Sequence, residues 1–333
     1  MGLDHKSEKP HERMAAELSG DLAAVNLLIR ERMASKHAPR IPEVTAHLVE
    51  AGGKRLRPML TLAAARMCGY DGPYHIHLAA TVEFIHTATL LHDDVVDESG
   101  KRRGRPTANL LWDNKSSVLV GDYLFARSFQ LMVETGSLTV LDILANASAT
   151  IAEGEVLQLT AAQDLTTDEG IYLQIVRGKT AALFAAATEV GGIIANAPAR
   201  QVEALRVYGD ALGISFQIVD DLLDYGGDAE ATGKNIGDDF RERKLTLPLI
   251  KAIAKADVQE RTFWERTIEK GKQGEGDLEH ALSLLARHGA MEATRADAVQ
   301  WSDTAKAAMA KLPESPFRQM LIDLADFVVA RLR

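Results

Sequence analysis

The sequence is poor in cysteine. Its 333 residues include one, Cys68, so the chain cannot close an internal disulfide and suits a reducing compartment. We therefore expect a cytoplasmic protein. Cys68 lies inside the apolar stretch LAAARMCGY, where a small buried side chain is a better interpretation than a catalytic thiol.

Long apolar runs and an excess of positive charge are also lacking. The N-terminal stretch MGLDHKSEKPHERM is polar, so no signal peptide is visible. The most apolar run, AALFAAATEVGGIIANAPA, contains Glu189, two adjacent glycines and Pro198, which favours a buried core helix over a membrane span. The formal net charge of −9 argues against non-specific binding of nucleic acids, which requires a basic surface.

Strand signals are scarce, whereas helical spacing is widespread. Apolar residues recur at helical intervals in EFIHTATLLHDD, ALFAAATEVGGII, LGISFQIVDDLLD and MLIDLADFVVARL. Turn-forming stretches such as GYDGPY and LPESP divide the chain into about a dozen helices. No linker rich in Pro, Ser or Gly separates two halves. We therefore predict an all-α fold, with a flexible N-terminus over residues 1–15 and a single domain over residues 16–333.

Two aspartate clusters follow long apolar helices. LLHDDVVDE (90–98) and FQIVDDLLD (216–224) both contain the pattern DDxxD, whose first and last aspartates share one helix face. Unpaired carboxylates stacked in this way repel one another, and aspartate is unfavourable at the negative end of a helix. One such cluster could equally be a solvated helix end. Two clusters in the same context instead indicate bound cations.

Carboxylate oxygens suit a hard ion such as Mg²⁺. Mg²⁺ usually takes one or two carboxylates, keeps several waters and shares its remaining positions with substrate phosphates. The two clusters therefore predict a site in which Mg²⁺ ions hold a diphosphate group.

Basic residues lie near both clusters. In GGKRLRP (52–58), Lys54 and Arg57 can face one anion, beside glycines that allow close approach of the backbone. In GKRRGRP (100–106), the paired arginines can grip phosphate oxygens. RGKTAALF and GKNIGDDFRERK supply further cations. Taken alone, each would more often be an ordinary surface side chain.

His86 lies two helical turns before Asp93 on the same face. It is either a satisfied core histidine or a donor to a second diphosphate. No Ser/His/Asp order, zinc-ligand spacing or Gly-rich nucleotide loop stands out elsewhere.

Five motifs, GGKRLRP, HDDVVDESGKRRG, GKTAALF, FQIVDDLLDY and GKNIGDDFRERK, occur in this order and resemble those of the trans-polyprenyl diphosphate synthases. Within that family the chain is most similar to the long-chain octaprenyl and decaprenyl type, which makes quinone side chains. The resemblance covers the chain from about Ala16 onward. It implies the isoprenoid synthase fold, an all-helical bundle or barrel around a central cavity, usually as a homodimer.

The resemblance also implies a prenyltransferase that adds isopentenyl diphosphate repeatedly to an allylic diphosphate such as farnesyl diphosphate. About two to three Mg²⁺ ions would serve each site. No nucleic-acid partner is expected, and membrane contact would be at most transient, during product release.

Roles follow by resemblance, residue by residue. The diphosphate of isopentenyl diphosphate would be bound by Lys54, Arg57, His86 and Arg103. The allylic diphosphate would be bound by Arg102, Lys179, Thr180, Gln217 and Lys234. The Mg²⁺ ligands would be Asp93, Asp97 and Asp220, supported by Asp94, Asp221, Asp224 and Asp238. The residues most directly catalytic would be Asp93, Asp97, Arg102, Lys179, Asp220 and Lys234.

One position departs from the family pattern. Arg243 stands where the family commonly has glycine, just before Lys244. This departure leaves the role of Lys244 open more than it affects the reaction.

The residues just before the first cluster bear on product length. Ala88 and Thr89 lie about one helical turn before Asp93, and both are small. A bulky aromatic there would stop the growing chain, so their size predicts a long product of the C40–C50 class, without separating C40 from C50.

Three alternatives remain open. A short-chain synthase making C15 or C20 is the closest. A terpene cyclase would share the first aspartate cluster but would need neither a second DDxxD nor GGKRLRP. A non-catalytic synthase subunit would have lost the aspartates, and here all six are present.

Overall fold

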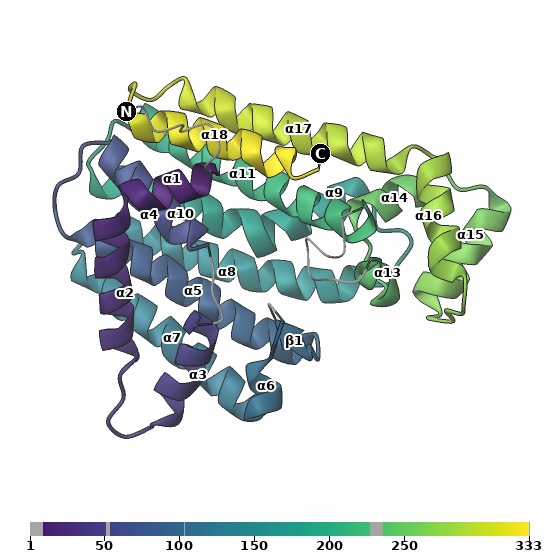
Figure 1. Ribbon diagram of the computed structural model, residues 1–333, viewed down its shortest axis with the longest axis horizontal. Coiled ribbons are helices and arrows are strands. Elements are labelled where there is room, and N and C mark those ends of the chain that lie inside the picture. Colours follow the sequence, from purple (N-terminus) through teal and green to yellow (C-terminus); the bar gives the residue numbers. More distant parts are fainter. Residues whose placement is uncertain (1–8, 51–53, 103, 227–235, 333) are drawn as a thin grey trace, which may run out of the picture. The chain divides into compact units, whose positions relative to one another are not determined.

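The structure, a computed structural model, describes residues 9–50, 54–102, 104–226 and 236–332. Within these residues the only strands are two short ones of two residues each, which pair as a hairpin. The predicted all-α class is therefore confirmed (Figure 1). The first elements are α1 (Pro10–Glu17), α2 (Ser19–Met33), α3 (Arg40–Glu50), α4 (Leu56–Met67), α5 (Tyr74–Val96), β1 (Lys101–Arg102), β2 (Arg105–Pro106), α6 (Ala108–Leu111), α7 (Asn114–Glu134) and α8 (Leu138–Ala161).

The chain continues as one long helix in three parts and then as a series of shorter and longer helices. These elements are α9 (Glu169–Val176), η1 (Arg177–Ala181), α10 (Ala182–Ile194), α11 (Ala199–Gly226), α13 (Asp238–Arg241), α14 (Leu247–Ile253), α15 (Val258–Trp264), η2 (Glu265–Glu269), α16 (Asp277–Arg287), α17 (Ala290–Met309) and α18 (Pro316–Ala330). The segment η1 is a π-helical turn between α9 and α10.

Several helices begin at side-chain caps that the sequence supplies. Asp113 accepts a hydrogen bond from the backbone of Ser116 at 2.6 Å and starts α7, and Asp168 accepts one from Ile171 at 2.9 Å and starts α9. Such caps satisfy backbone N–H groups that a helix leaves free in its first turn. The predicted breaks at GYDGPY and LPESP fall between α4 and α5 and between α17 and α18.

The N-terminal helix α1 begins at Pro10, ahead of the predicted domain start at residue 16. Its Met14 is 0% exposed, and Arg13 forms an ion pair with Asp323 of α18 at 3.1 Å. Burial of one apolar side chain and this ion pair give the segment a place in the fold that its polar composition did not predict.

The chain folds into two compact units, each built from segments that are separated along the sequence. The first unit comprises Met1–Ser148, Leu183–Arg206 and Met309–Leu324, and the second comprises Ala149–Ala182, Val207–Ala308 and Ala325–Arg333. We predict a single domain over residues 16–333 from the lack of a linker, and no linker of that kind marks the boundaries of these units.

In the first unit, α5 is the central helix. It packs against α2, α4 and α7, and Figure 1 shows α5 and α7 running side by side. Because α5 has neighbours on several sides, it is apolar around most of its circumference, and Leu78, Ile85 and Leu91 are each 0% exposed. This burial makes its acidic C-terminal end stand out.

The apolar run that could be mistaken for a membrane span forms α10, and the predicted core helix is confirmed. Gly191 lies so close to α4 that a Cβ added to it would stand 2.8 Å from the carbonyl oxygen of Thr61. Within the described residues, no helix combines the length and the apolar character needed to cross a bilayer.

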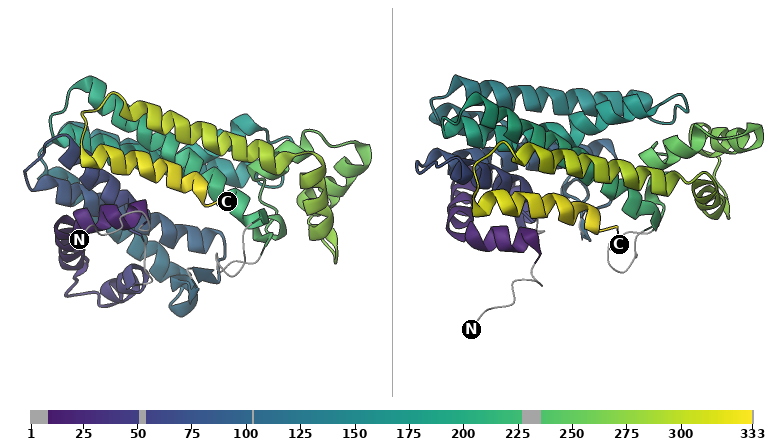
Figure 2. Two further views of the ribbon diagram at one scale, coloured as in Figure 1. Left: turned by 45° about the horizontal axis from the view of Figure 1, so that its top comes forward. Right: turned by 90° about the horizontal axis from the view of Figure 1, so that it is seen from above.

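The second unit contains a core formed by its shorter helices. The green to yellow-green helices α14, α15 and α16 pack together (Figure 1, with two further views in Figure 2). The rings of Phe263 and Trp264 meet edge to face at 4.9 Å between centroids. Lys251 of α14 pairs with Glu169 of α9 at 2.8 Å and with Asp297 of α17 at 2.9 Å, which ties three helices together.

Candidate active site

The first aspartate cluster lies where α5 ends. Asp97 is the C-cap of α5, and its backbone N–H donates to the carbonyl oxygen of Asp93 at 2.8 Å. Asp93 is half-buried and Asp97 is exposed, whereas Asp94 is 0% exposed. The cluster therefore has a buried middle carboxylate and two outer carboxylates that solvent can reach.

Asp94 is paired with Arg102 of the β-hairpin. Nε and Nη2 of Arg102 donate to Oδ1 of Asp94 at 2.9 and 2.8 Å. Oδ2 of Asp94 is buried and makes no hydrogen bond within the described part of the chain. Asp94 thus holds Arg102 in place, while the arginine side chain, 28% exposed, remains accessible to an anion.

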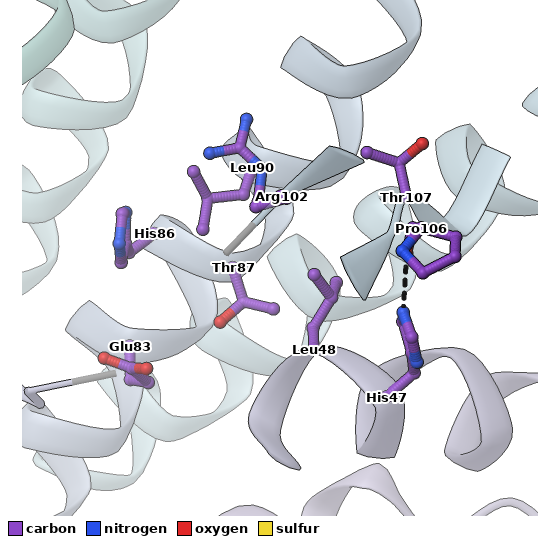
Figure 3. Close-up of a pocket in the computed structure, with 9 residues that line it drawn as sticks. All are labelled: His47, Leu48, Glu83, His86, Thr87, Leu90, Arg102, Pro106 and Thr107. Carbon is purple, nitrogen blue, oxygen red and sulfur yellow. Dashed lines mark hydrogen bonds between the residues drawn. The ribbon is translucent and has the colours of Figure 1, made fainter. Parts of the chain in front are cut away.

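A pocket in the first unit opens beside Arg102 (Figure 3). It encloses about 430 Å³, part of which is open solvent. Its lining residues are His47, Leu48, Glu83, His86, Thr87, Leu90, Arg102, Pro106 and Thr107. Nε2 of His47 lies 2.9 Å from the carbonyl oxygen of Pro106, which links α3 to the hairpin. The structure thereby brings together two predicted phosphate-binding residues, His86 and Arg102.

Arg57 also lies at His86. Its Nη1 is 3.1 Å from Nε2 of His86, and its guanidinium stacks on the ring of Phe184 at 4.6 Å. A guanidinium can only donate, so Nε2 accepts and the proton of the neutral imidazole resides on Nδ1. Three of the predicted basic residues are therefore gathered around α5.

The ion pair between Arg55 and Glu83 was missed by sequence reasoning. Their side chains are 16% and 10% exposed, and Arg55 adopts a left-handed φ of 48° at the start of α4. Glu83 lies one turn before His86 on α5, a spacing that could have signalled its role. The pair links Arg55, the residue just before α4, to α5. Lys54, in the same stretch, is exposed, and its charge lowers the pKa of His11 further than burial alone does.

In the second cluster, on α11, the middle carboxylate is again buried but its partners are neutral. Asp221 is 5% exposed, and its Oδ2 accepts a hydrogen bond from the hydroxyl of Tyr172 at 2.6 Å. Oδ1 of Asp221 accepts one from Nε2 of Gln217 at 2.9 Å, and Oε1 of Gln217 accepts one from Thr180 at 2.9 Å. The structure thus joins three predicted residues to Tyr172, which sequence reasoning missed. Its position seven residues before Lys179 in one helix was the available signal.

The adjacent aspartates of this cluster lie in different electrostatic surroundings. The pKa of Asp221 is raised to about 6, chiefly by burial and also by the charges of Asp220 and Asp224, against the hydrogen bonds from Tyr172 and Gln217. Asp220, in contrast, has a side chain 40% exposed, with Nη2 of Arg331 at 3.6 Å. Asp220 is therefore the member of the adjacent pair that an ion can reach.

Lys179 and Thr180 lie in the π-helical turn η1. A Cβ added to Gly178 would stand 2.7 Å from the Cα of Gly154 in α8, so the two backbones touch where a side chain would keep them apart. This contact places Nζ of Lys179 2.8 Å from Oε2 of Glu155. Short π-helical turns inside longer helices occur frequently at functional sites.

Asp224 positions the segment that follows the second cluster. It is 6% exposed, and its Oδ2 accepts a hydrogen bond from the backbone of Asp239 at 3.1 Å, so it caps α13. In GDDFRERK, Asp238 pairs with Arg241 at 2.9 Å and Lys244 pairs with Glu242 at 2.6 Å.

Arg243 adopts a φ of 59°, in the left-handed region that glycine occupies without strain. The glycine that the family resemblance leads one to expect here would therefore suit the backbone conformation. The Arg243 side chain lies against Gly271, where an added Cβ would meet Nη1 at 2.6 Å.

The chain-length candidates lie on the buried part of α5. Ala88 is 0% exposed, and half-buried Thr89 donates its hydroxyl hydrogen to the carbonyl oxygen of His86 at 2.8 Å. Two predicted phosphate-binding residues, Arg103 and Lys234, lie outside the described residues.

Cys68 closes α4 and is half-buried, and burial raises the pKa of its thiol. A raised pKa disfavours the thiolate, as expected for a residue without a nucleophilic role.

The donor set fits Mg²⁺ bound together with a substrate. Within the described residues, no three side chains of His, Cys, Asp or Glu come close enough to hold an ion by themselves. The accessible aspartates supply hard oxygen ligands and leave further positions to water and phosphate, which is the usual arrangement for Mg²⁺. The two clusters belong to different compact units, and their sharing of one ligand stays a prediction.

Comparison with known proteins gives extensive matches. A family model described as polyprenyl synthetase matches residues 38–285. The chain is 75% identical to a decaprenyl diphosphate synthase from Rhodobacter capsulatus, with a TM-score of 0.95 over 97% of this chain and 100% of that one. It is 53% identical to a polyprenyl synthase from Caulobacter crescentus CB15 solved with calcium and isoprenyl diphosphate, with a TM-score of 0.91 over 97% and 98% of the two chains. The octaprenyl diphosphate synthase of Escherichia coli K12 is 45% identical over 94% of this chain and 96% of that protein.

Proposed function

We propose, on the premise that this chain belongs to the polyprenyl synthetase family, that its two aspartate clusters and the basic residues around them bind two diphosphate substrates. The chain is a long-chain trans-prenyl diphosphate synthase of the C40–C50 class, a prenyltransferase with the isoprenoid synthase fold. The observation that carries the site assignment is the pocket beside the first cluster, where His86, with Arg57 at its ring, and Arg102 meet.

Members of this family use a divalent metal together with a diphosphate, as the calcium and isoprenyl diphosphate complex illustrates. For this chain we infer about two to three Mg²⁺ ions, with Asp93, Asp97 and Asp220 as ligands. The bound metal would neutralise charge on the leaving diphosphate. Asp94, Asp221, Asp224 and Asp238 support the site through other protein groups, because each hydrogen bonds to a neighbour in the protein.

The basic residues divide between the two substrates. Lys54, Arg57, His86 and Arg103 bind isopentenyl diphosphate, and Arg102, Lys179, Thr180, Gln217 and Lys234 bind the allylic diphosphate. Arg102 is held by Asp94 and Lys179 by Glu155, so both cations are oriented before substrate arrives. Preoriented charge of this kind stabilises the negative charge that develops on a departing diphosphate.

We infer that the reaction proceeds in the following steps. The allylic C–O bond breaks, leaving a diphosphate anion and an allylic carbocation. The terminal alkene of isopentenyl diphosphate attacks the cation, a C–C bond forms, and the resulting cation loses a proton to the released diphosphate. The apolar surface of α5, including Ala88, excludes water that would otherwise capture the cation.

Product length provides the direct test. Purified protein with Mg²⁺, farnesyl diphosphate and labelled isopentenyl diphosphate is expected to yield C40–C50 lipid, identified by mass spectrometry after dephosphorylation. Ala88→Phe should shorten the product because the ring, at a fully buried position on α5, would take room that the proposal assigns to the growing chain.

Two substitutions at the same position make the test quantitative. Ala88→Leu should give an intermediate length, and Ala88→Gly should leave the length unchanged while costing about 1 kcal/mol of helix stability. An Ala88→Phe enzyme that folds, turns over and makes lipid of unaltered length would refute the placement of the growing chain beside α5.

Assembly and location complete the proposal. The α7 surface exposes Leu119 to 66% and Val133 to 65%, and a row of exposed apolar side chains on one helix marks a contact surface. A homodimer through this helix is our proposal, to be checked by sedimentation at several concentrations. Transient membrane contact during product release, a cytoplasmic location and use of the product in quinone side chains stay predictions.

A further inference from the structure

Two hydrogen bonds fasten the helix of α9 and η1 to α11, and both involve buried groups of the second unit. Near one end, the hydroxyl of Tyr172 donates to Asp221 at 2.6 Å. Two turns further along, Thr180 donates to Gln217 at 2.9 Å. Tyr172 is 4% exposed and Asp221 is 5% exposed, so solvent does not compete for the first of these bonds.

The four side chains form one directed chain of donors and acceptors. The Thr180 hydroxyl donates to Oε1 of Gln217, which turns Nε2 of the same amide toward Oδ1 of Asp221. Tyr172 donates to the other oxygen, Oδ2. Each oxygen of the buried carboxylate therefore has one donor, and removal of either donor would leave a buried acceptor unsatisfied.

We propose that Tyr172 is a positioning residue for the allylic-diphosphate site. Its hydroxyl fixes the Asp221 carboxylate, and Asp221 in turn fixes the Gln217 amide and the register of η1 against α11. Lys179 lies in η1 and Asp220 lies next to Asp221, so this register sets where both groups stand. The inference rests on the proposed function of these residues and adds a residue that acts through Asp221.

The first test removes only the hydroxyl. Tyr172→Phe keeps the ring and its packing, and the matched control is Tyr225→Phe, because Tyr225 is 5% exposed and its hydroxyl accepts from Thr246 at 3.3 Å. We expect Tyr172→Phe to weaken the calorimetric affinity for magnesium pyrophosphate about tenfold, the effect of one hydrogen bond to a charged group. The KM for farnesyl diphosphate should rise by a similar factor, while that for isopentenyl diphosphate and all Tyr225→Phe values stay within about twofold.

The second test asks whether Tyr172 acts through Asp221. Asp221→Asn is combined with Tyr172→Phe, and the affinity for magnesium pyrophosphate is measured for both single variants and the double variant. If the tyrosine works only by holding this carboxylate, the double variant binds no more weakly than Asp221→Asn alone. If the fold-losses in affinity of the two single variants instead multiply in the double variant, Tyr172 acts independently of Asp221 and the proposal is overturned.

Other outcomes are equally decisive. Tyr172 would be only a packing residue if Tyr172→Phe had the same affinity for magnesium pyrophosphate and the same KM values as Tyr225→Phe. The same conclusion would follow if the KM values for both substrates rose equally. Loss of helical circular dichroism in Tyr172→Phe would likewise overturn the proposal, because the hydroxyl would then be required for folding. A wild-type protein that neither binds magnesium pyrophosphate nor elongates farnesyl diphosphate would instead refute the proposed function itself.

Discussion

In the first aspartate cluster the middle carboxylate, Asp94, meets the guanidinium of Arg102, whereas in the second cluster Asp221 meets the neutral side chains of Tyr172 and Gln217. The last aspartates differ as well, since Asp97 is exposed and Asp224 is buried and caps α13. Adjacent residues on a helix point about 100° apart, so a DD pair on a packed helix must turn one member inward. In both clusters the buried member of the adjacent pair is the second aspartate, and its surroundings decide how its charge is met.

Loss of an accessible aspartate should have the largest effect. Asp93→Ala and Asp220→Ala should each lower kcat/KM about 10³-fold or more, because each removes a proposed metal ligand, while helical circular dichroism persists. Steady-state kinetics at saturating Mg²⁺ measure the loss. The two clusters are functionally equivalent if the losses agree; a near-normal rate for either variant would break the equivalence and remove that cluster from the metal site.

Replacing the buried aspartate should change the free energy of unfolding in opposite directions in the two clusters when stability is measured without metal. Asp94→Asn should destabilise the protein by about 1–2 kcal/mol at pH 8, because Arg102 loses a charged partner and is only partly exposed. Asp221→Asn should be neutral or stabilising, because the fold already disfavours the ionised form of this carboxyl. Urea unfolding in EDTA measures both.

The pH dependence sharpens this contrast. Since the pKa of Asp221 in the folded protein, about 6, lies above its ordinary value, the wild type holds more protons when folded and loses stability as pH rises from about 4 through 6. Asp221→Asn should lack this loss. Its stability relative to the wild type should therefore be lower at pH 5 than at pH 8. The contrast would be refuted if the stability difference between Asp221→Asn and the wild type were the same at pH 5 and pH 8. It would also be refuted if Asp94→Asn and Asp221→Asn lowered the free energy of unfolding equally.

The loops after the clusters should give the smallest effect. Each contains a left-handed residue, Gly104 with φ 75° in the first and Arg243 with φ 59° in the second. Arg243→Gly should stabilise by up to about 1 kcal/mol and Gly104→Ala should destabilise by about 1 kcal/mol, because only glycine adopts this conformation freely. Urea midpoints would show opposite shifts, and shifts of the same sign would refute the backbone explanation.

The sequence predicts those features whose causes are local. Helix periodicity and turn stretches lead to the all-α fold, whereas the different roles expected of Asp220 and its neighbour Asp221 come from the family resemblance. Partners remote along the chain were not predictable: Arg55 and Glu83 are 28 residues apart, and Tyr172 and Asp221 are 49 apart. Nothing in the local pattern distinguishes a tyrosine that donates to a carboxylate from one that fills space. The helix at Pro10 was missed because one buried methionine and one ion pair outweigh a polar composition.

The close approach of Gly154 and Gly178 makes the choice of residue at each position depend on the other, although the two lie far apart along the chain. A methyl group at either position would push apart the backbones of α8 and η1, because an added Cβ would stand 2.8 Å or less from the opposing Cα. Such a wedge would also carry Lys179 away from Glu155. A substitution at one glycine alone would therefore have to be followed by a rearrangement of this helix crossing before Lys179 could again lie beside Glu155.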